Sequence, residues 1–145
     1  MKYLKTLTLL SSNSFFKIFL ICIVLDTVLG VLRAIKYGEF NSAFGIDGAI
    51  RKVAMSICIV ALMCIDVIMS INAAFMIPDA YLKFLGISKL GLSEFFSLLF
   101  ILYELVSILK NMTLLELPVP KRIQAYVTKA LEDITDEMDN VPGKD

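Results

Sequence analysis

Three long apolar stretches of the sequence each carry an acidic side chain at or near the middle. The stretches are Phe15–Ile35 with Asp26, Val53–Ile77 with Asp66, and Leu92–Leu109 with Glu104. An acid at the centre of a membrane helix costs about 2.5–3.5 kcal/mol, so such residues normally face a bundle interior, a partner subunit or water. We therefore expect a small membrane protein that assembles or forms a polar path.

The first acid belongs to a helix face that is suited to close contact. Arg33 follows Asp26 by seven residues, about two turns along the same face of a helix. Gly30 and Ala34 form a small-xxx-small pair beside it, which permits close helix approach. This face is a candidate for oligomerisation or for lining a pore, and a polar contact inside one subunit is the alternative interpretation.

The other two acids begin polar stripes. Asp66 shares a helix face with Ser70, and Glu104 shares one with Ser107 and Asn111. Such stripes line water or join helices by hydrogen bonds, each worth about 0.6 kcal/mol on average in membranes. We expect no Lys or His to match these acids at depth, which disfavours a dedicated proton or cation relay.

Composition supports a membrane protein and excludes several functions. The chain has 145 residues, of which 58% are hydrophobic, and its mean hydropathy is +0.79. Fourteen basic residues balance 14 acidic ones, so net charge indicates no nucleic-acid partner. The chain has no His, its three Cys are scattered through the apolar stretches, and no nucleotide-binding loop or zinc spacing occurs. We predict no enzyme activity, no cofactor and no metal.

These residues require helices long enough to cross a bilayer. About 20 residues span the hydrocarbon core, so we predict transmembrane helices over about 15–35, 53–77 and 92–110. All four prolines lie outside the apolar stretches, which favours uninterrupted helices. The predicted class is an all-α integral membrane protein with a membrane domain over 1–117. Residues 118–145 are predicted to form a cytoplasmic amphipathic helix and tail.

The connections have different characters. The segment 36–50 contains turn residues, including three glycines, and is expected to be a loop. Within 72–91, the segment 78–85 mixes aromatic and charged residues and is expected to form a short helix at the membrane surface. The basic N-terminus is followed by polar Ser11–Ser14 and lacks a small-x-small cleavage site, so the first helix is interpreted as a retained anchor.

Basic residues predict the orientation in the membrane. Five would lie on one side: Lys2, Lys5, Lys17, Lys83 and Lys89. Eight would lie on the other: Arg33, Lys36, Arg51, Lys52, Lys110, Lys121, Arg122 and Lys129. This bias predicts a multi-pass protein of the cytoplasmic membrane with its N-terminus outside and its C-terminus in the cytoplasm.

Two separated motifs stand out along the chain. The first comprises Asp26-Thr-Val-Leu-Gly30, Arg33-Ala34-Ile-Lys36, Gly38, Asn41-Ser42, Gly45, Gly48 and Lys52. The second comprises Glu104-Leu-Val-Ser107-Ile-Leu-Lys-Asn111 and Pro118-Val-Pro120. Together they resemble the motifs of the toxin-secretion/phage-lysis holin family of Gram-positive phages and clostridia. The resemblance extends roughly from Phe15 to Ile123. Two departures are Lys110, where relatives often have Glu, and the absence of a second Met before Met55.

The resemblance implies a protein that accumulates in the membrane, assembles with itself and permeabilises the bilayer during host lysis. Its partners would be lipid, further copies of itself and, functionally, an endolysin or a toxin. The family's loop motif would correspond to Asn41, Ser42, Gly45, Gly48 and Lys52.

Two other functions fit the residues without the resemblance. One is a small selective ion channel or transporter subunit, which would pass ions and exclude dyes. The other is a non-pore membrane adaptor that recruits a partner through its C-terminal helix.

Overall fold

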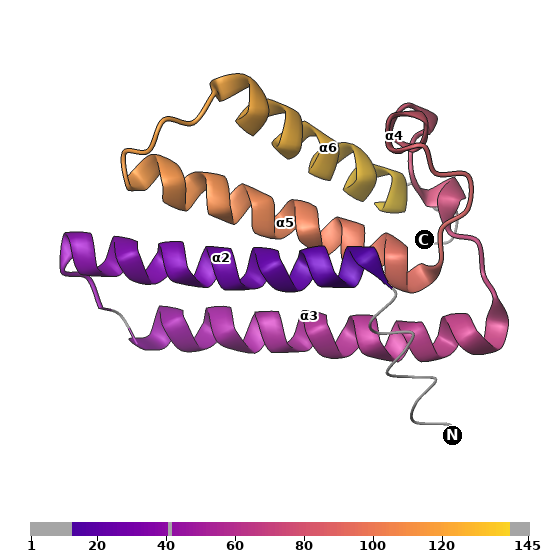
Figure 1. The fold of residues 1–145 in the computed structure, drawn as a ribbon, viewed down its shortest axis with the longest axis horizontal. Helices are drawn as coiled ribbons and strands as arrows, with labels where there is room; N and C mark the ends of the chain where they lie inside the picture. The colour runs from indigo at the N-terminus through magenta and orange to yellow at the C-terminus, as the bar shows by residue number, and fades with distance from the viewer. Residues whose placement is uncertain (1–12, 41, 140–145) are drawn as a thin grey trace.

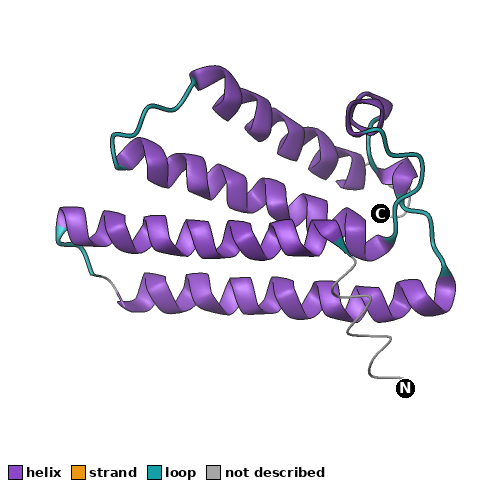
Figure 2. Cartoon of the chain, viewed as in Figure 1, coloured by secondary structure: helices purple, strands orange, loops and turns teal. Residues whose placement is uncertain are grey.

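The computed structural model describes residues 13–40 and 42–139, which form helices joined by short loops (Figures 1 and 2). In chain order the elements are α2 (Ser14–Tyr37), α3 (Ser42–Met69), the 3₁₀ turn η1 (Ala74–Met76), α4 (Asp79–Leu85), α5 (Leu92–Leu114) and α6 (Lys121–Asp139). No strand occurs over these two ranges. Three helices, at Ser14–Tyr37, Gly45–Met69 and Leu92–Leu114, are long and apolar enough to cross a membrane. The predicted all-α class with three spanning helices and a C-terminal helix is confirmed.

Both ends of α2 are set by local chemistry. The Asn13 side chain caps the start, accepting a hydrogen bond from the Phe16 amide at 3.0 Å. Gly38 ends the helix in the left-handed region, at φ 65°, which a residue with a Cβ adopts only with strain. The Gly38 and Glu39 amides then donate to the carbonyls of Ile35 and Ala34. These caps fix α2 as a helix of 24 residues with Asp26 close to its middle.

Helix α3 differs from the expected span at both ends. It begins at Ser42, inside the segment expected to be a loop, and ends at Met69 instead of near 77. Gly45 and Gly48 therefore lie within a helix, and Asn41 lies outside the described residues. Glycine weakens a helix by about 1 kcal/mol relative to alanine, but an unpaired backbone group in hydrocarbon costs several kcal/mol. The membrane therefore favours the helix in spite of its glycines.

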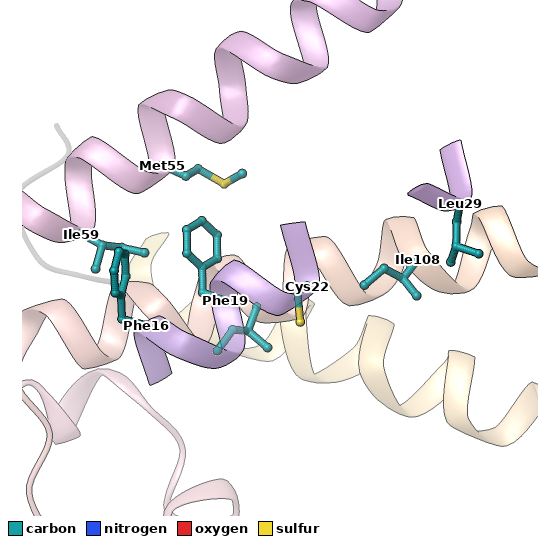
Figure 3. Packing of buried hydrophobic residues seen from close by; sticks show 8 residues of the cluster. Phe16, Phe19, Cys22, Leu29, Met55, Ile59 and Ile108 are labelled. Carbon is teal, nitrogen blue, oxygen red and sulfur yellow. The ribbon is translucent and has the colours of Figure 1, made fainter. Parts of the chain in front are cut away.

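Helix α5 is the central element of the molecule. It packs along α2 most extensively and also contacts α3. Helix α6 runs along its other side (Figure 1). Between these helices, buried apolar side chains form a continuous core, shown in Figure 3. Its members are Phe16, Phe19, Cys22 and Leu29 from α2, Met55 and Ile59 from α3, and Ile101 and Ile108 from α5. The core holds the three spanning helices side by side.

A second apolar cluster packs the connection between α3 and α5 against the start of α5. It comprises Ala73, Ala74, Ile77, Leu90, Phe95 and Leu99. The Asn72 side chain joins the two ends of this connection, because its Oδ1 accepts hydrogen bonds from the Ala74 amide at 3.2 Å and the Leu90 amide at 3.1 Å. Helix α4 lies where the short helix was expected.

Helix α6 turns back after the Leu115–Pro120 segment and runs along α5 (Figure 1). Ala130 is buried, and Leu131 packs against the second apolar cluster. The Tyr81 hydroxyl of α4 donates to Asp133 Oδ2 at 2.6 Å, and the ring of Tyr126 contacts that of Tyr81. The amphipathic helix thus finds a partner surface within the same chain. Its placement in the cytoplasm stays a prediction.

Candidate functional site

Asp26 lies on the buried face of α2 because it continues the helical spacing of the apolar core. Phe19, Cys22, Asp26 and Leu29 are spaced three or four residues apart and are all buried. A carboxylate at a core position must find donors within the protein, since burying an unpaired charge is very costly.

Lys52 of α3 provides the main donor and joins two acids. Its Nζ lies 2.7 Å from Asp26 Oδ2 and 2.6 Å from Glu104 Oε2. The three side chains are 16%, 11% and 3% exposed, respectively. One ammonium therefore connects α2, α3 and α5 near the middle of the bundle.

Asn111 and Arg33 extend this arrangement toward the end of α2. Asn111 Nδ2 donates to Asp26 Oδ1 at 2.9 Å, and Arg33 Nη1 donates to Asn111 Oδ1 at 3.0 Å. A Cβ added to Gly30 would lie 3.9 Å from Asn111 Nδ2. The face that carries Asp26, Gly30 and Arg33 thus meets α5 of the same chain. We call Asp26, Arg33, Lys52, Glu104 and Asn111 the buried network.

The buried network balances its own charge. It contains two carboxylates and two cations, and no buried side-chain nitrogen or oxygen among the described residues is left without a hydrogen-bond partner. Such an arrangement is tolerated in hydrocarbon because every charge meets an opposite charge or a polar group. Removing one member leaves the others uncompensated, which typically costs about 3–5 kcal/mol for a buried pair.

The expectation that no Lys matches the acids at depth is wrong. Lys52 was placed at the near end of its helix because that helix was expected to begin at Val53, whereas α3 begins at Ser42. A signal was present in the sequence: Lys52 precedes Met55 and Ile59 by three and seven residues, so it shares their helix face. Both of those residues are buried in the core.

Asp66 has a different position from the other two acids. It lies in the last turn of α3 rather than in the middle of a span, because α3 ends at Met69. Its oxygens accept hydrogen bonds from the Leu92 and Ser93 amides, both at 2.8 Å, and from the Ser93 hydroxyl at 2.6 Å. Asp66 therefore caps the N-terminus of α5, where a negative charge is favoured.

The cap explains why residue 91 is a glycine. A Cβ at Gly91 would lie 2.8 Å from Asp66 Oδ2, which is closer than real Cβ contacts. The Gly91 amide is bonded to the Glu94 side chain at 2.9 Å. Asp66 and Glu94 together hold the start of α5.

Three further predicted residues lie outside the buried network. Ser70 is exposed at the end of α3 with φ 49°, and its amide donates to the Asp66 carbonyl. Ser107 and Ala34 are partly buried. Across residues 13–40 and 42–139, no group of three or more His, Cys, Asp or Glu side chains has an arrangement that could hold a metal ion.

Comparison with known proteins agrees with this membrane architecture. The model of the bacteriophage holin family matches residues 5–133. The chain is also 53% identical over 133 residues to the holin-like protein TcdE of Clostridioides difficile, covering 92% of this chain and 80% of that protein. No solved structure matches. The chain, a multi-pass membrane protein with a charged interior, belongs to the bacteriophage holin family.

Proposed function

We propose that this holin assembles with itself in the cytoplasmic membrane and permeabilises it, releasing a cytoplasmic endolysin or a toxin. The observation that carries this proposal is the buried network, in which charged groups lie near the middle of three spanning helices. Because the charges balance inside one subunit, a single copy can reside in the bilayer without exposing them to lipid.

In the proposed mechanism, the charged side chains of the buried network change their partners when copies of the protein assemble. In a dispersed subunit, Lys52 shields Asp26 and Glu104 from hydrocarbon. In an assembly, the same polar groups gain alternative partners, either water or the polar faces of neighbouring copies. Water around the opened network would provide a polar lining for a membrane lesion. No step of this process requires a catalytic group, which fits a non-enzymatic pore-forming protein.

The same proposal includes an orientation. This orientation has the N-terminus outside the cell and the C-terminus in the cytoplasm, and it is supported by the basic residues that follow the third span, Lys121, Arg122 and Lys129. Arg51 and Lys52 do not count toward it, because both lie within the second span.

Inducible expression in a bacterium tests the proposal. Viability, membrane potential and release of a co-expressed cytoplasmic endolysin are followed together. We expect an abrupt, timed collapse of the potential with enzyme release. Collapse without enzyme release would indicate a selective channel, and no collapse at verified expression would indicate an adaptor; either result contradicts the proposal.

A variant series connects the activity to the buried network. Asp26→Asn and Glu104→Gln remove charge with little change in shape, and both are expected to shift the time of collapse. Asp79→Asn, in α4 outside the network, is the matched control and should keep native timing. Unchanged timing in the first two variants would remove the network from the mechanism while leaving the holin function intact.

A further inference from the structure

The outer surface of α3 carries a charged patch that no helix among residues 13–40 and 42–139 covers. It consists of Asp47, Arg51 and, from α5, Tyr103. The side chains of Arg51 and Asp47 are 51% and 79% exposed, and Arg51 Nη2 lies 3.9 Å from Asp47 Oδ2. Arg51 Nη1 donates to the Tyr103 hydroxyl at 2.6 Å, with the guanidinium 5.5 Å from the ring centre.

Position along the helices places the Arg51–Tyr103 contact at bilayer depth, whereas Asp47 lies near the start of the span Gly45–Met69. Arg51 adjoins Lys52, whose ammonium meets Asp26 and Glu104 near the middle of α2 and α5. Tyr103 adjoins Glu104. The Arg51–Tyr103 hydrogen bond therefore lies in the hydrocarbon region when the three helices span, away from the headgroups.

The patch has unused bonding capacity at that depth. A guanidinium offers five N–H donors, and within the described part of the chain Arg51 makes one hydrogen bond and one loose ion pair. A half-exposed charge facing lipid is costly, and charged residues inside membranes normally pair within protein. Its neighbour one turn on, Ala54, is exposed and small, so a second helix can approach closely here.

We propose that this patch is an interface between two copies of the chain, in which parallel α3 helices pack about a two-fold axis along the membrane normal. In such a pair each Arg51 reaches Asp47 of the other copy, because a two-fold interface is self-complementary and the patch carries both signs of charge. This interface rests on the proposed function in one respect: it would be one of the contact surfaces of the proposed self-assembly.

Charge reversal in separate copies tests the pairing. Arg51→Glu leaves two negative charges on this face, and Asp47→Arg leaves two positive charges, so neither variant can form the ion pair within its own chain. We expect each alone to give about tenfold less chemically cross-linked dimer than the native chain, because pairing is replaced by repulsion. Co-expression of the two should restore the dimer.

The control for this experiment is a second exposed ion pair. Lys36 Nζ and Glu116 Oε1 are 3.3 Å apart at one end of the bundle, and reversing either charge should leave the dimer unchanged. Native dimer levels in the single Arg51 and Asp47 variants would overturn the proposal. So would a co-expressed mixture that inserts into the membrane without recovering the dimer.

Two native cysteines provide an independent test that needs no permeabilisation activity. Cys58 follows Arg51 by seven residues and shares its helix face, whereas Cys64 is exposed on a different face. With Cys22 replaced by Ala, a chain keeping Cys58 alone should form a disulfide-linked dimer on mild oxidation in membranes. A chain keeping Cys64 alone should not.

The results of the cysteine experiment distinguish a second copy of the chain from water as the neighbour of this surface. Equal cross-linking at both cysteines, or none at Cys58, contradicts the α3 pair. Reaction of Cys58 with a membrane-impermeant thiol reagent, without cross-linking, would assign the patch to a water-filled lumen instead. If the Cys58 dimer forms in a chain that fails to release endolysin, the interface stands and the proposed function fails.

Discussion

At the scale of single residues, the ammonium of Lys52 controls the electrostatics of the bundle interior. It lies within 2.7 Å of an oxygen of each of two carboxylates, and all three groups are largely shielded from the surroundings. In hydrocarbon there is no water to compensate a missing charge. Substitutions within the buried network are therefore expected to change the free energy of unfolding non-additively.

Lys52→Met should destabilise the protein by about 3–5 kcal/mol, because it leaves Asp26 and Glu104 buried without a counter-charge. The measurement is the melting temperature of the purified protein in detergent micelles. Combining Lys52→Met with Asp26→Asn and Glu104→Gln removes all three charges and should recover most of the loss. Lys110→Met, at an exposed position of α5, is the control. A native melting temperature for Lys52→Met would contradict this account.

The contact between Gly91 and Asp66 makes a second prediction at this scale. Gly91→Ala should be destabilising in the native chain because its Cβ would lie 2.8 Å from Asp66 Oδ2. Asp66→Ala should cost about 0.5–2 kcal/mol through loss of the α5 cap. In the double variant the alanine at 91 should cost less than in the native chain, since the clash is gone. A thermal double-mutant cycle measures this coupling, and strict additivity would contradict a direct contact.

At the scale of elements, the contact between α4 and α6 has its own pH dependence. The hydrogen bond to Asp133, together with partial burial, raises the pKa of Tyr81 to about 12 from its ordinary value of 10.0. A raised tyrosine pKa means that the neutral phenol is favoured in the folded state. The resulting stabilisation is complete below pH 10 and is lost as the pH rises through about 12.

Absorbance of tyrosinate checks this prediction. Native protein should show a late ionisation step from Tyr81, and Tyr81→Phe should remove that step. Tyr103→Phe, which changes a tyrosine that contacts Arg51 of α3 instead of Asp133, should leave the step in place. A titration of Tyr81 at the ordinary value would show that the α4–α6 contact does not hold in solution.

The elements also show how far the sequence determined this structure. Apolar length predicted the three spans, because hydrophobic thickness is a property of composition and needs no tertiary information. The start of α3 was missed because Gly45 and Gly48 are turn residues in water, while a bilayer penalises unpaired backbone more strongly than it penalises glycine.

That error carried over to the candidate site. Asp26, Glu104 and Asn111 were identified from their depth in the apolar stretches, and they do come together. A span that begins at Val53 leaves Lys52 in the flank, where it does not meet the two acids. Which oxygen meets which donor depends on how α2, α3 and α5 are rotated about their axes. That rotation is set by packing of residues such as Phe19 and Ile59, and no single-helix pattern specifies it.

At the scale of the whole molecule, α6 contributes no residue to the buried network or to the three spanning helices. Deletion of residues 121–145 should therefore preserve permeabilisation while altering its timing, since α6 covers part of the second apolar cluster. Endolysin release after induction measures both properties. A non-pore adaptor would lose all function with this deletion. Complete loss of release from a chain that still inserts would contradict the holin mechanism proposed above.

The course of α6 has a consequence for membrane topology. Three spans are an odd number of crossings and leave the two ends of the chain on opposite sides. In Figure 1 a loop leads from the end of α5 to α6, which runs back along α5 and finishes near η1 and α4. If α6 followed this course through a bilayer, it would add a fourth crossing and make the number of crossings even. However, α6 is not one of the helices that are apolar enough to cross. A molecule with α6 packed along α5 through the bilayer would cross the membrane an even number of times, whereas a molecule with three spans crosses it an odd number of times. The side of the membrane on which residue 139 is found therefore reports which of the two a given molecule has adopted.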